Sequence, residues 1–264
     1  MSAPKGTALI TGASTGIGAV YADRLAKRGY DLILVARNEE MLSEAAARLK
    51  STGHRIETIT ADLMKKEDVQ RVADRLNTDS TITALVNNAG LGSARKLLDE
   101  KIDDLESMIY LNVTALTRLA LAALPGFVAR KNGLLINIAS VVALAPDLLN
   151  GTYSGTKAYV VNFTQALKNE LAGTGVTIQA VLPGATATPF WEKAGRPVDD
   201  LPAEMVMTAE DMVDASLAGL DQHELVTIPT LPDVADWEKY DAARKALGPN
   251  LSRQMPAARY SIQN

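Results

Sequence analysis

Two side chains four residues apart, Tyr153 and Lys157, have the types and spacing of an acid/base pair. On a helix, residues at i and i+4 lie on the same face, so the ammonium group would lie beside the phenol. A nearby positive charge favours phenolate over phenol and would lower the tyrosine pKa from about 10. Tyr153 would then be a usable general acid or base. Because this spacing arises by chance in many helices, the pair needs support from elsewhere in the chain.

Two further polar residues are expected near that pair. Ser140 directly follows an aliphatic run at residues 134–139, which predicts a buried strand, so its hydroxyl is expected at the carboxyl edge of the sheet. Asn112 lies in the long helical stretch at residues 102–130 that precedes the same strand.

A glycine-rich turn follows the first predicted strand. Its sequence is Thr-Gly-Ala-Ser-Thr-Gly-Ile-Gly at residues 11–18, and a helical stretch begins at Gly16. Backbone N–H groups at a helix N-terminus, together with the helix dipole, make an anion site, and glycine lets the backbone approach a pyrophosphate. An ordinary glycine-rich turn is the alternative, but its place in the first strand–turn–helix unit favours dinucleotide binding.

The second predicted strand ends in Ala36 and Arg37, about 20 residues after the glycines. Enzymes that use NAD carry an acidic residue there to bind the ribose 2′-hydroxyl. A guanidinium instead suits the 2′-phosphate of NADP, through a charge-assisted fork. A solvated surface arginine is the alternative interpretation.

The next two strands end in polar residues. Asp62 follows the third strand, where it could accept a hydrogen bond from the adenine amino group or cap the helix at residues 65–77. These two interpretations do not exclude each other. The fourth strand ends in Asn87-Asn88-Ala89-Gly90, whose small residues would let the backbone pass close to a cofactor.

The elements that must position these residues alternate along the chain. Runs rich in aliphatic and β-branched residues predict strands at residues 8–11, 32–35, 56–60, 84–87, 134–139 and 176–182. Helical spacing predicts helices at residues 16–28, 39–50, 65–77, 102–130, 152–171 and 208–220, the last with Thr208 as N-cap. This alternation predicts an α/β fold, a doubly wound parallel sheet of the Rossmann type with helices on both faces.

Composition excludes several classes of protein. The 264 residues include no cysteine, so disulfides, thiolate nucleophiles and cysteine-ligated metal sites are impossible. A net charge of −4 gives no basic footprint for nucleic acid. The N-terminus lacks an apolar signal-peptide core. The apolar stretch at residues 111–128 is expected to be a helix packed against a sheet or another subunit instead of one that crosses a membrane. A cytoplasmic protein is expected. No linker interrupts residues 1–220, and the tail is taken as part of the same single domain, which then covers residues 1–264.

Taken together, the motifs resemble those of the classical short-chain dehydrogenase/reductase family over residues 5–190. The resemblance rests on the 11–18 turn, Asp62, the 87–90 motif, Asn112, Ser140, the Tyr153-x-x-x-Lys157 pair and Pro183-Gly184, in the family's order and spacing.

The resemblance implies an NADP(H)-dependent enzyme that transfers hydride between the nicotinamide and a carbonyl or alcohol, with no metal. Tyr153 would be the acid/base, Ser140 would polarise the carbonyl, Lys157 would also hold the nicotinamide ribose, and Asn112 would anchor a water in a proton relay. Besides Tyr153, Lys157 and Arg37, the residues that would line the cofactor are Gly12, Ser14, Thr15, Gly16, Ile17, Gly18, Asp62, Leu63, Asn88, Ala89, Gly90, Pro183, Gly184, Thr186 and Thr188.

The remaining chain carries less specific expectations. Four prolines between residues 183 and 202 indicate a substrate loop at 189–207, and Phe190, Trp191, Met205 and Met207 suggest an apolar wall for a ketone or pack against the domain. The family's usual Asp-Gly-Gly-type terminal strand is absent, and residues 221–264 form an atypical extension. Helices 102–130 and 152–171 are expected to pair in a homodimer or homotetramer.

Three alternatives to an oxidoreductase are disfavoured by the sequence. A cofactor-binding sensor on the same fold would typically have lost the tyrosine or the lysine, and this chain keeps both. An epimerase or dehydratase of the extended branch would show a different glycine spacing and a longer substrate domain. A hydrolase triad is disfavoured because the only histidines, His54 and His223, fall near a helix end and in a late loop.

Overall fold

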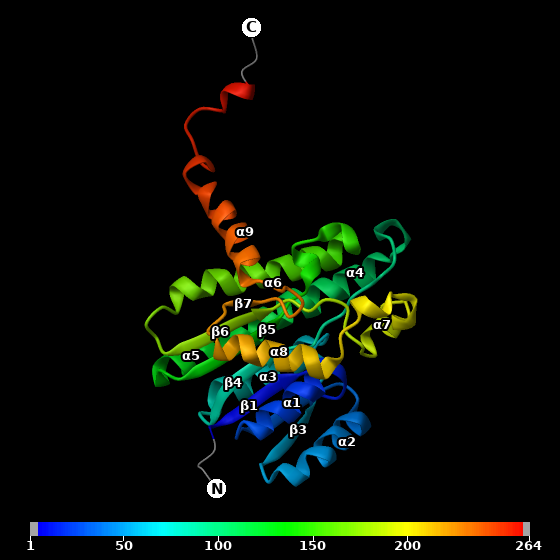
Figure 1. Cartoon of the computed structure of the whole chain (residues 1–264). Coiled ribbons are helices and arrows are strands. Elements are labelled where there is room, and N and C mark those ends of the chain that lie inside the picture. The colour runs from blue at the N-terminus through cyan, green and yellow to red at the C-terminus, as the bar shows by residue number, and fades with distance from the viewer. Residues whose placement is uncertain (1–4, 261–264) are drawn as a thin grey trace. The chain divides into compact units, whose positions relative to one another are not determined.

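The computed structural model describes residues 5–260. Its centre is a parallel sheet in the order β3-β2-β1-β4-β5-β6-β7 (Figure 1). The strands are β1(Thr7–Thr11), β2(Asp31–Ala36), β3(Ile56–Thr60), β4(Ile82–Asn87), β5(Gly133–Ile138), β6(Val176–Val181) and β7(Val226–Thr227). The six predicted strands and the doubly wound α/β fold are confirmed. The seventh strand has two residues and comes from the short apolar run at 225–228.

The described helices are α1(Gly16–Lys27), α2(Glu39–Leu49), α3(Lys66–Thr78), α4(Ile102–Ile109), α5(Leu116–Arg130), α6(Gly151–Glu170), α7(Phe190–Lys193), α8(Ala209–Asp221) and α9(Val234–Ala246). Of these, α1, α2 and α8 pack on one face of the sheet, and α3, α5 and α6 pack on the other. Alternate strand residues point to opposite faces. Ile10 and Leu34 pack with α1, α2 and α8, whereas Leu9 and Ile33 pack with α3 and α5.

The predicted helix at residues 102–130 is interrupted. Between α4 and α5 the backbone takes a π-helical course, η3(Tyr110–Ala115), which includes Asn112. Among the described helices, the stretch from Ile102 to Arg130 is long and apolar enough to span a membrane by length and composition, but half of its most apolar window is buried within the chain. It therefore packs as a core helix against the sheet, as expected for residues 111–128.

A buried polar network fixes the last strand. The Tyr21 hydroxyl on α1 hydrogen-bonds to that of Ser216 on α8. The Gln179 amide on β6 donates to the Ser216 carbonyl at 2.9 Å and to Thr227 Oγ1 on β7 at 2.8 Å. Because unpaired polar groups are costly in an interior, these bonds specify how α8 and the two-residue β7 join the sheet.

The described chain divides into two compact units, one ending at Pro229 and one beginning at Thr230. Of the predicted extension at 221–264, the first residues, including β7, thus belong to the main unit. In the second unit, α9 begins at the N-cap Asp233, whose side chain accepts a hydrogen bond from the Ala235 amide at 2.8 Å. None of the residues in α9 is buried.

Candidate active site

Tyr153 and Lys157 lie one turn apart near the start of α6, and both are buried. The helix begins where the Asn150 side chain accepts a hydrogen bond from the Tyr153 amide at 3.0 Å. Lys157 Nζ donates to the Ile138 carbonyl, at the end of β5, at 3.0 Å and lies 5.8 Å from the centroid of the Tyr153 ring. The expected helical pair is thus held against a strand end.

Ser140 reaches the same place from the end of β5. Its hydroxyl hydrogen-bonds to the Tyr153 phenol. It also approaches the Pro183 carbonyl at 3.3 Å, so Ser140 connects the tyrosine to the segment after β6.

The pKa of Tyr153 differs in direction from the expectation. Burial raises it to about 12, and the Ser140 hydrogen bond offsets only part of that rise. Burial also lowers the pKa of Lys157, to about 8. The expectation of a lowered tyrosine pKa is therefore wrong for the chain by itself, because removal from water penalises both the phenolate and the ammonium.

Asn112, in the π-helical segment, ties three parts of the site together. Its side-chain oxygen accepts from the Leu91 amide at 2.8 Å, and its nitrogen donates to the Leu91 carbonyl at 2.8 Å and to Thr156 Oγ1 at 3.0 Å. A Cβ atom on Gly90 would lie 3.2 Å from Asn112 Oδ1 and 3.5 Å from Lys157 Nζ. The loop after β4 therefore passes directly beside α6, and its small residues leave room for this approach.

The glycine-rich turn is shaped for close backbone approach. Gly12 and Gly16 have positive φ angles of 68° and 53°. A Cβ atom on Gly18 would lie 2.3 Å from the Gly12 carbonyl oxygen, so only glycine fits there. The first turn of α1 contains no acidic residue, which leaves its N–H groups and positive dipole end suited to an anion. The remaining turn residues, Ser14, Thr15 and Ile17, lie at the start of this helix, Ile17 packing against the core.

The 87–90 motif is joined to this turn. Thr11 Oγ1 accepts from the amides of Asn88 and Ala89, each at 3.0 Å, and the Asn88 side chain donates to the Thr11 carbonyl at 2.9 Å. These bonds lock the ends of β1 and β4 together beneath the turn. The Asn87 side chain instead donates to Asn137 Oδ1 on β5 at 3.0 Å and to the Leu116 carbonyl of α5 at 3.3 Å.

At the far side of the sheet, Arg37 follows β2 and is exposed. Asp62 follows β3, and its carboxylate accepts from the Met64 amide at 3.1 Å, while Leu63 is buried in the core. The helix-capping interpretation of Asp62 is wrong, because α3 begins later and Lys65 is its N-cap. The Asp62 carboxylate instead stabilises the turn between β3 and α3.

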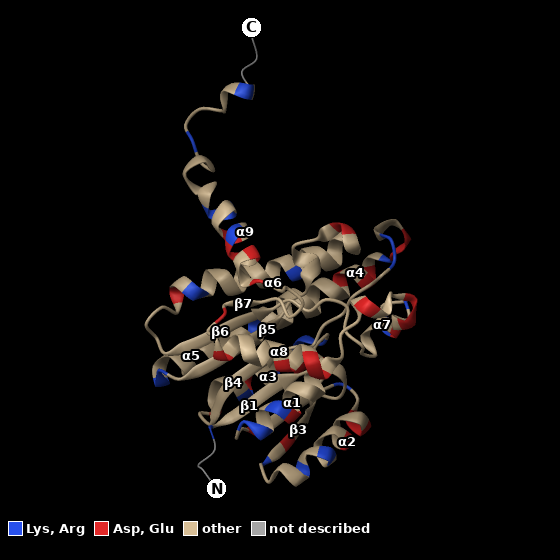
Figure 2. Ribbon diagram, in the orientation of Figure 1, with Lys and Arg blue, Asp and Glu red and all other residues tan. Residues whose placement is uncertain are grey.

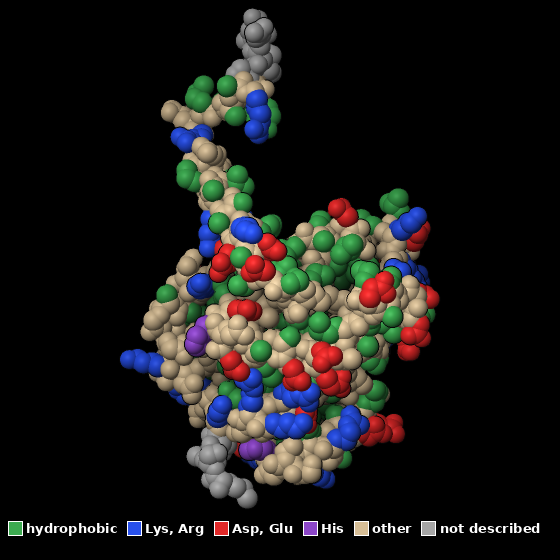
Figure 3. All heavy atoms as spheres, viewed as in Figure 1, with side chains coloured by type: hydrophobic (Ala, Val, Ile, Leu, Met, Phe, Trp, Pro, Cys, Tyr) green, Lys and Arg blue, Asp and Glu red, His purple; other side chains and the backbone are tan. Residues whose placement is uncertain are grey.

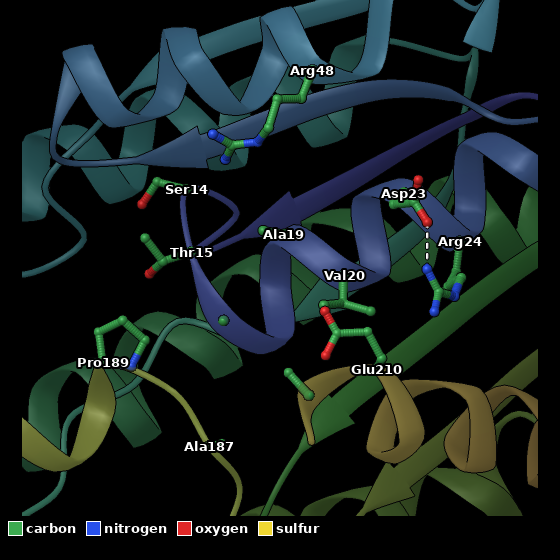
Figure 4. A pocket seen from close by; sticks show the side chains of 12 residues that line it. Ser14, Thr15, Ala19, Val20, Asp23, Arg24, Arg48, Ala187, Pro189 and Glu210 are labelled. Carbon is green, nitrogen blue, oxygen red and sulfur yellow. Dashed lines mark hydrogen bonds and ion pairs between the residues drawn. The ribbon is translucent and has the colours of Figure 1, made fainter. Parts of the chain in front are cut away.

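Arg48 is a basic residue that sequence reasoning missed. A hollow of about 490 Å³ on the outer side of α1 is lined by Ser14 and Thr15 of the turn, by Arg48 of α2 and by residues of the 187–210 region (Figure 4). Figure 4 shows the Arg48 side chain extending from α2 over this hollow. Nothing in the sequence selects Arg48 as a candidate site residue, because an exposed arginine on a helix is common.

The segment after β6 lies against the glycine-rich turn. Pro183 and Thr186 are buried, and Thr186 Oγ1 donates to the Gly184 carbonyl at 3.2 Å. A Cβ atom on Gly16 would lie 3.1 Å from Thr188, so this segment closes over the start of α1. The structure thus brings Pro183 to Ser140 and Thr188 to the turn.

An apolar cluster surrounds the Tyr153 ring. Met108 and Val142 are buried with it, and Leu91, Leu149 and Phe190 pack against the three. Of the four residues suggested as an apolar wall, Phe190 contacts Tyr153, and Trp191 contacts Phe190 edge-on. Met207 packs in the core on the opposite face and Met205 is exposed. Met108, Val142 and Leu149 were missed because nothing in their local sequence marks them.

The fold is that of a Rossmann-like α/β domain, and comparison with known proteins identifies the family. The model of the family described as short chain dehydrogenase matches residues 6–198. The chain therefore belongs to the short-chain dehydrogenases.

Individual relatives are similar over most of the chain. A short-chain dehydrogenase from Sphingobium yanoikuyae, solved in complex with NADPH, is 45% identical with a TM-score of 0.94 and covers 97% of this chain and 100% of its own. The bulky-bulky ketone specific alcohol dehydrogenase from Comamonas testosteroni is 40% identical with a TM-score of 0.89, covering 97% and 99%. The 17-beta-hydroxysteroid dehydrogenase type 3 of Danio rerio is 33% identical over 80% of this chain and 68% of its own.

The buried Lys157 leads to a prediction about stability and pH. Its folded pKa of about 8 lies below the ordinary value of 10.5, so between these values the unfolded chain binds more protons. The free energy of unfolding contributed by Lys157 should therefore rise between about pH 8 and pH 10. Above that window Tyr153, with its raised pKa, acts in the opposite direction. Denaturant unfolding of wild type and Lys157→Met should give a difference that shifts in favour of wild type across the window; a constant or falling difference would contradict the prediction.

Proposed function

We propose that this chain is an NADP(H)-dependent oxidoreductase that interconverts a ketone or aldehyde and an alcohol, with Tyr153 as general acid/base. The observation that carries the proposal is the convergence of the Tyr153 phenol, the Ser140 hydroxyl and the Lys157 ammonium at the carboxyl edge of the sheet. Membership of the short-chain dehydrogenases and the likeness to an enzyme solved with NADPH support it.

The residues present fit a dinucleotide. The positive φ angles of Gly12 and Gly16 and the close packing of Gly18 make a cradle that a side chain would fill, at the N-terminus of α1. We propose that this turn holds the pyrophosphate, that Asp62, Leu63 and residues 88–90 border the adenosine, and that Pro183, Gly184, Thr186 and Thr188 border the nicotinamide. When bound, the cofactor supplies or accepts the hydride.

The protein's own side chains handle the proton. Ser140 donates a hydrogen bond to the substrate oxygen and polarises the carbonyl. Tyr153 gives its proton to that oxygen in reduction and takes one in oxidation. A raised pKa keeps the phenol protonated at neutral pH, the state that reduction requires. Lys157 balances the charge that develops on the phenolate, and Asn112 holds the loop after β4 beside Lys157.

The substrate we propose is a ketone with hydrocarbon bulk. The wall around Tyr153 is formed by Met108, Val142, Leu149 and Phe190, none of which offers a charged group.

We propose that residues 189–207 form the substrate loop and that the protein is cytoplasmic. Lys, Arg, Asp and Glu are intermixed on the face in Figure 2, which fits a small-molecule substrate better than a nucleic acid.

Replacing Tyr153 with phenylalanine removes the proposed proton donor and little else. We expect Tyr153→Phe to lower the single-turnover rate of NADPH oxidation by a carbonyl about 10²- to 10⁴-fold while NADPH affinity is nearly unchanged. Tyr159→Phe is the matched control, because the Tyr159 hydroxyl, on the same helix, bonds to Thr117 at 2.8 Å. A loss under about tenfold in Tyr153→Phe would remove this residue from the role.

We propose that the cofactor is NADP(H) and that Arg37 is the main reason. Arg37 follows β2, carries no acidic neighbour at Ala36, and is exposed where it can meet a 2′-phosphate. A charge-assisted contact of this kind contributes about 1.5–3 kcal/mol, and exposure favours the lower part of that range.

Arg37→Ala should therefore weaken NADPH binding about 10- to 50-fold and leave NADH binding almost unchanged. Ala36→Asp combined with Arg37→Ala should invert the preference in kcat/KM by adding repulsion and an acceptor for the ribose. Lys168→Ala, which removes an exposed charge from α6, serves as the charge-matched control. Equal losses for both cofactors in Arg37→Ala would show a general charge effect instead.

We propose a homodimer or homotetramer built on the helices from Ile102 to Arg130 and on α6. Ile102, Ile109 and Leu121 expose 66%, 44% and 55% of their surface along the first of these helices. Figure 3 shows apolar side chains at the surface over α4.

Sedimentation at micromolar concentration should show a species heavier than the 28.1 kDa chain. Leu121→Lys should shift it toward the monomer, whereas Leu98→Lys, at a side chain that is 95% exposed and lies outside these helices, should not. A single species near the monomer mass in wild type would refute the assembly.

A further inference from the structure

The Phe190 ring is the part of the apolar wall that lies against the catalytic phenol. Its centroid is 6.0 Å from that of Tyr153, and the two planes are tilted by 39°. Tyr153 is only 6% exposed, whereas Phe190, at the start of α7, is half-buried. A substrate that brings a carbonyl to the phenol must therefore place its hydrocarbon part next to the Phe190 ring or displace it.

The missing side chain of Gly92 makes room for that ring. A Cβ atom on Gly92 would lie 2.3 Å from Cζ and 2.8 Å from Cε2 of Phe190, and 3.1 Å from Cε2 of Tyr153. Gly92 is not among the glycines with a positive φ angle, so its backbone would accept alanine. The contact with Phe190, which is shorter than the one with Tyr153, is the main reason that this position needs glycine.

The backbone that carries Phe190 is anchored on both sides. The Trp191 indole packs edge-on against Phe190, with ring centroids 5.7 Å apart, and its Nε1 donates to the Thr186 carbonyl at 3.0 Å. The Ala94 amide donates to the Ala194 carbonyl at 2.9 Å. This hydrogen bond joins the end of α7 to the loop that contains Gly92. The position of the ring relative to Tyr153 is thus set by Gly92 at its tip and Trp191 at its edge.

We infer that the Gly92–Phe190 contact sets the size of the hydrocarbon group that the enzyme admits beside Tyr153. This inference rests on the proposed ketone reductase function and adds a specificity determinant to it. Removing the ring leaves an apolar space of about one phenyl group, bordered by Met108, Val142 and Leu149. Adding a methyl group at Gly92 displaces the Phe190 ring, so most of the effect of that methyl group should be lost when Phe190 is absent.

The test is a double-mutant cycle with a series of phenyl ketones whose second substituent grows from methyl to tert-butyl and phenyl. Phe190→Ala should raise the ratio of kcat/KM for the largest over the smallest ketone at least tenfold, mainly through KM. Gly92→Ala should lower kcat/KM for the methyl ketone at least tenfold in the wild-type background and less than threefold in the Phe190→Ala background. Such coupling, about 1.4 kcal/mol for a tenfold difference, is the signature of direct contact.

Control variants separate the effect of the Gly92–Phe190 contact from a general loss of folding or activity. Phe163→Ala removes another aromatic partner, stacked on Tyr159 at 5.8 Å, and should leave the size ratio unchanged. Gly248→Ala adds a Cβ that meets nothing within 4 Å and should behave as wild type. NADPH affinity and the unfolding temperature of each variant show whether it is folded. If Phe190→Ala does not fold, Phe190→Leu takes its place in the cycle.

The outcomes distinguish the two proposals. A wild type that reduces these ketones, with additive effects of Gly92→Ala and Phe190→Ala or an unchanged size ratio, overturns the inference and leaves the proposed function standing. A folded, NADPH-binding wild type that reduces no carbonyl in the series overturns both.

Discussion

An ammonium group buried beside a phenol is the arrangement on which the rest of this site depends. Moving a lysine out of water is unfavourable, and the low pKa of Lys157 reflects that cost. The structure offsets it with a strand-end carbonyl, that of Ile138, and with the face of the Tyr153 ring. Both partners must be held rigidly, since a small displacement would leave the charge unpaired. Asn150 provides that rigidity by capping the N-terminus of α6, and the Asn112 amide provides it by donating to Thr156 on the same helix.

The parallel sheet explains how residues from distant parts of the chain reach this point. The carboxyl ends of the strands meet at one edge, so the loops after β1, β4, β5 and β6 converge there. The loops are then joined by short polar contacts: Thr11 to Asn88, Leu91 to Asn112, and Ser140 to Pro183. Each contact joins two strand ends or a strand end and a helix, so the cofactor cradle and the acid/base pair form one continuous framework.

The fold and the positions of Tyr153 and Lys157 could be predicted from the sequence because both follow from local patterns. Aliphatic runs marked the strands, glycines marked the turn, and the i, i+4 pair of Tyr153 and Lys157 marked α6. The π-helical turn at Asn112 could not be predicted, since the apolar pattern continues through it.

Properties of the site that depend on contacts between distant parts of the chain could not be predicted from the sequence either. The direction of the Tyr153 pKa depends on burial, which spacing does not reveal, and the packing of Met108 and Val142 on that ring follows only from the fold. The seventh strand has two residues and is specified by Gln179, Ser216 and Thr227 instead of by its own sequence.

The strand order has a consequence for a chain that is still being synthesised. β1 is made first yet lies inside the sheet, with β2 and β3 extending it on one side and β4 to β7 on the other. On each side, every strand after the first pairs with the strand made just before it, so the sheet can grow outward in the order of synthesis. The exception is the return of β4 to β1, where Thr7 pairs with Ile82. Until that return, the Thr11 hydroxyl lacks its partners at Asn88 and Ala89, so the nucleotide cradle cannot be completed by the first three strands alone.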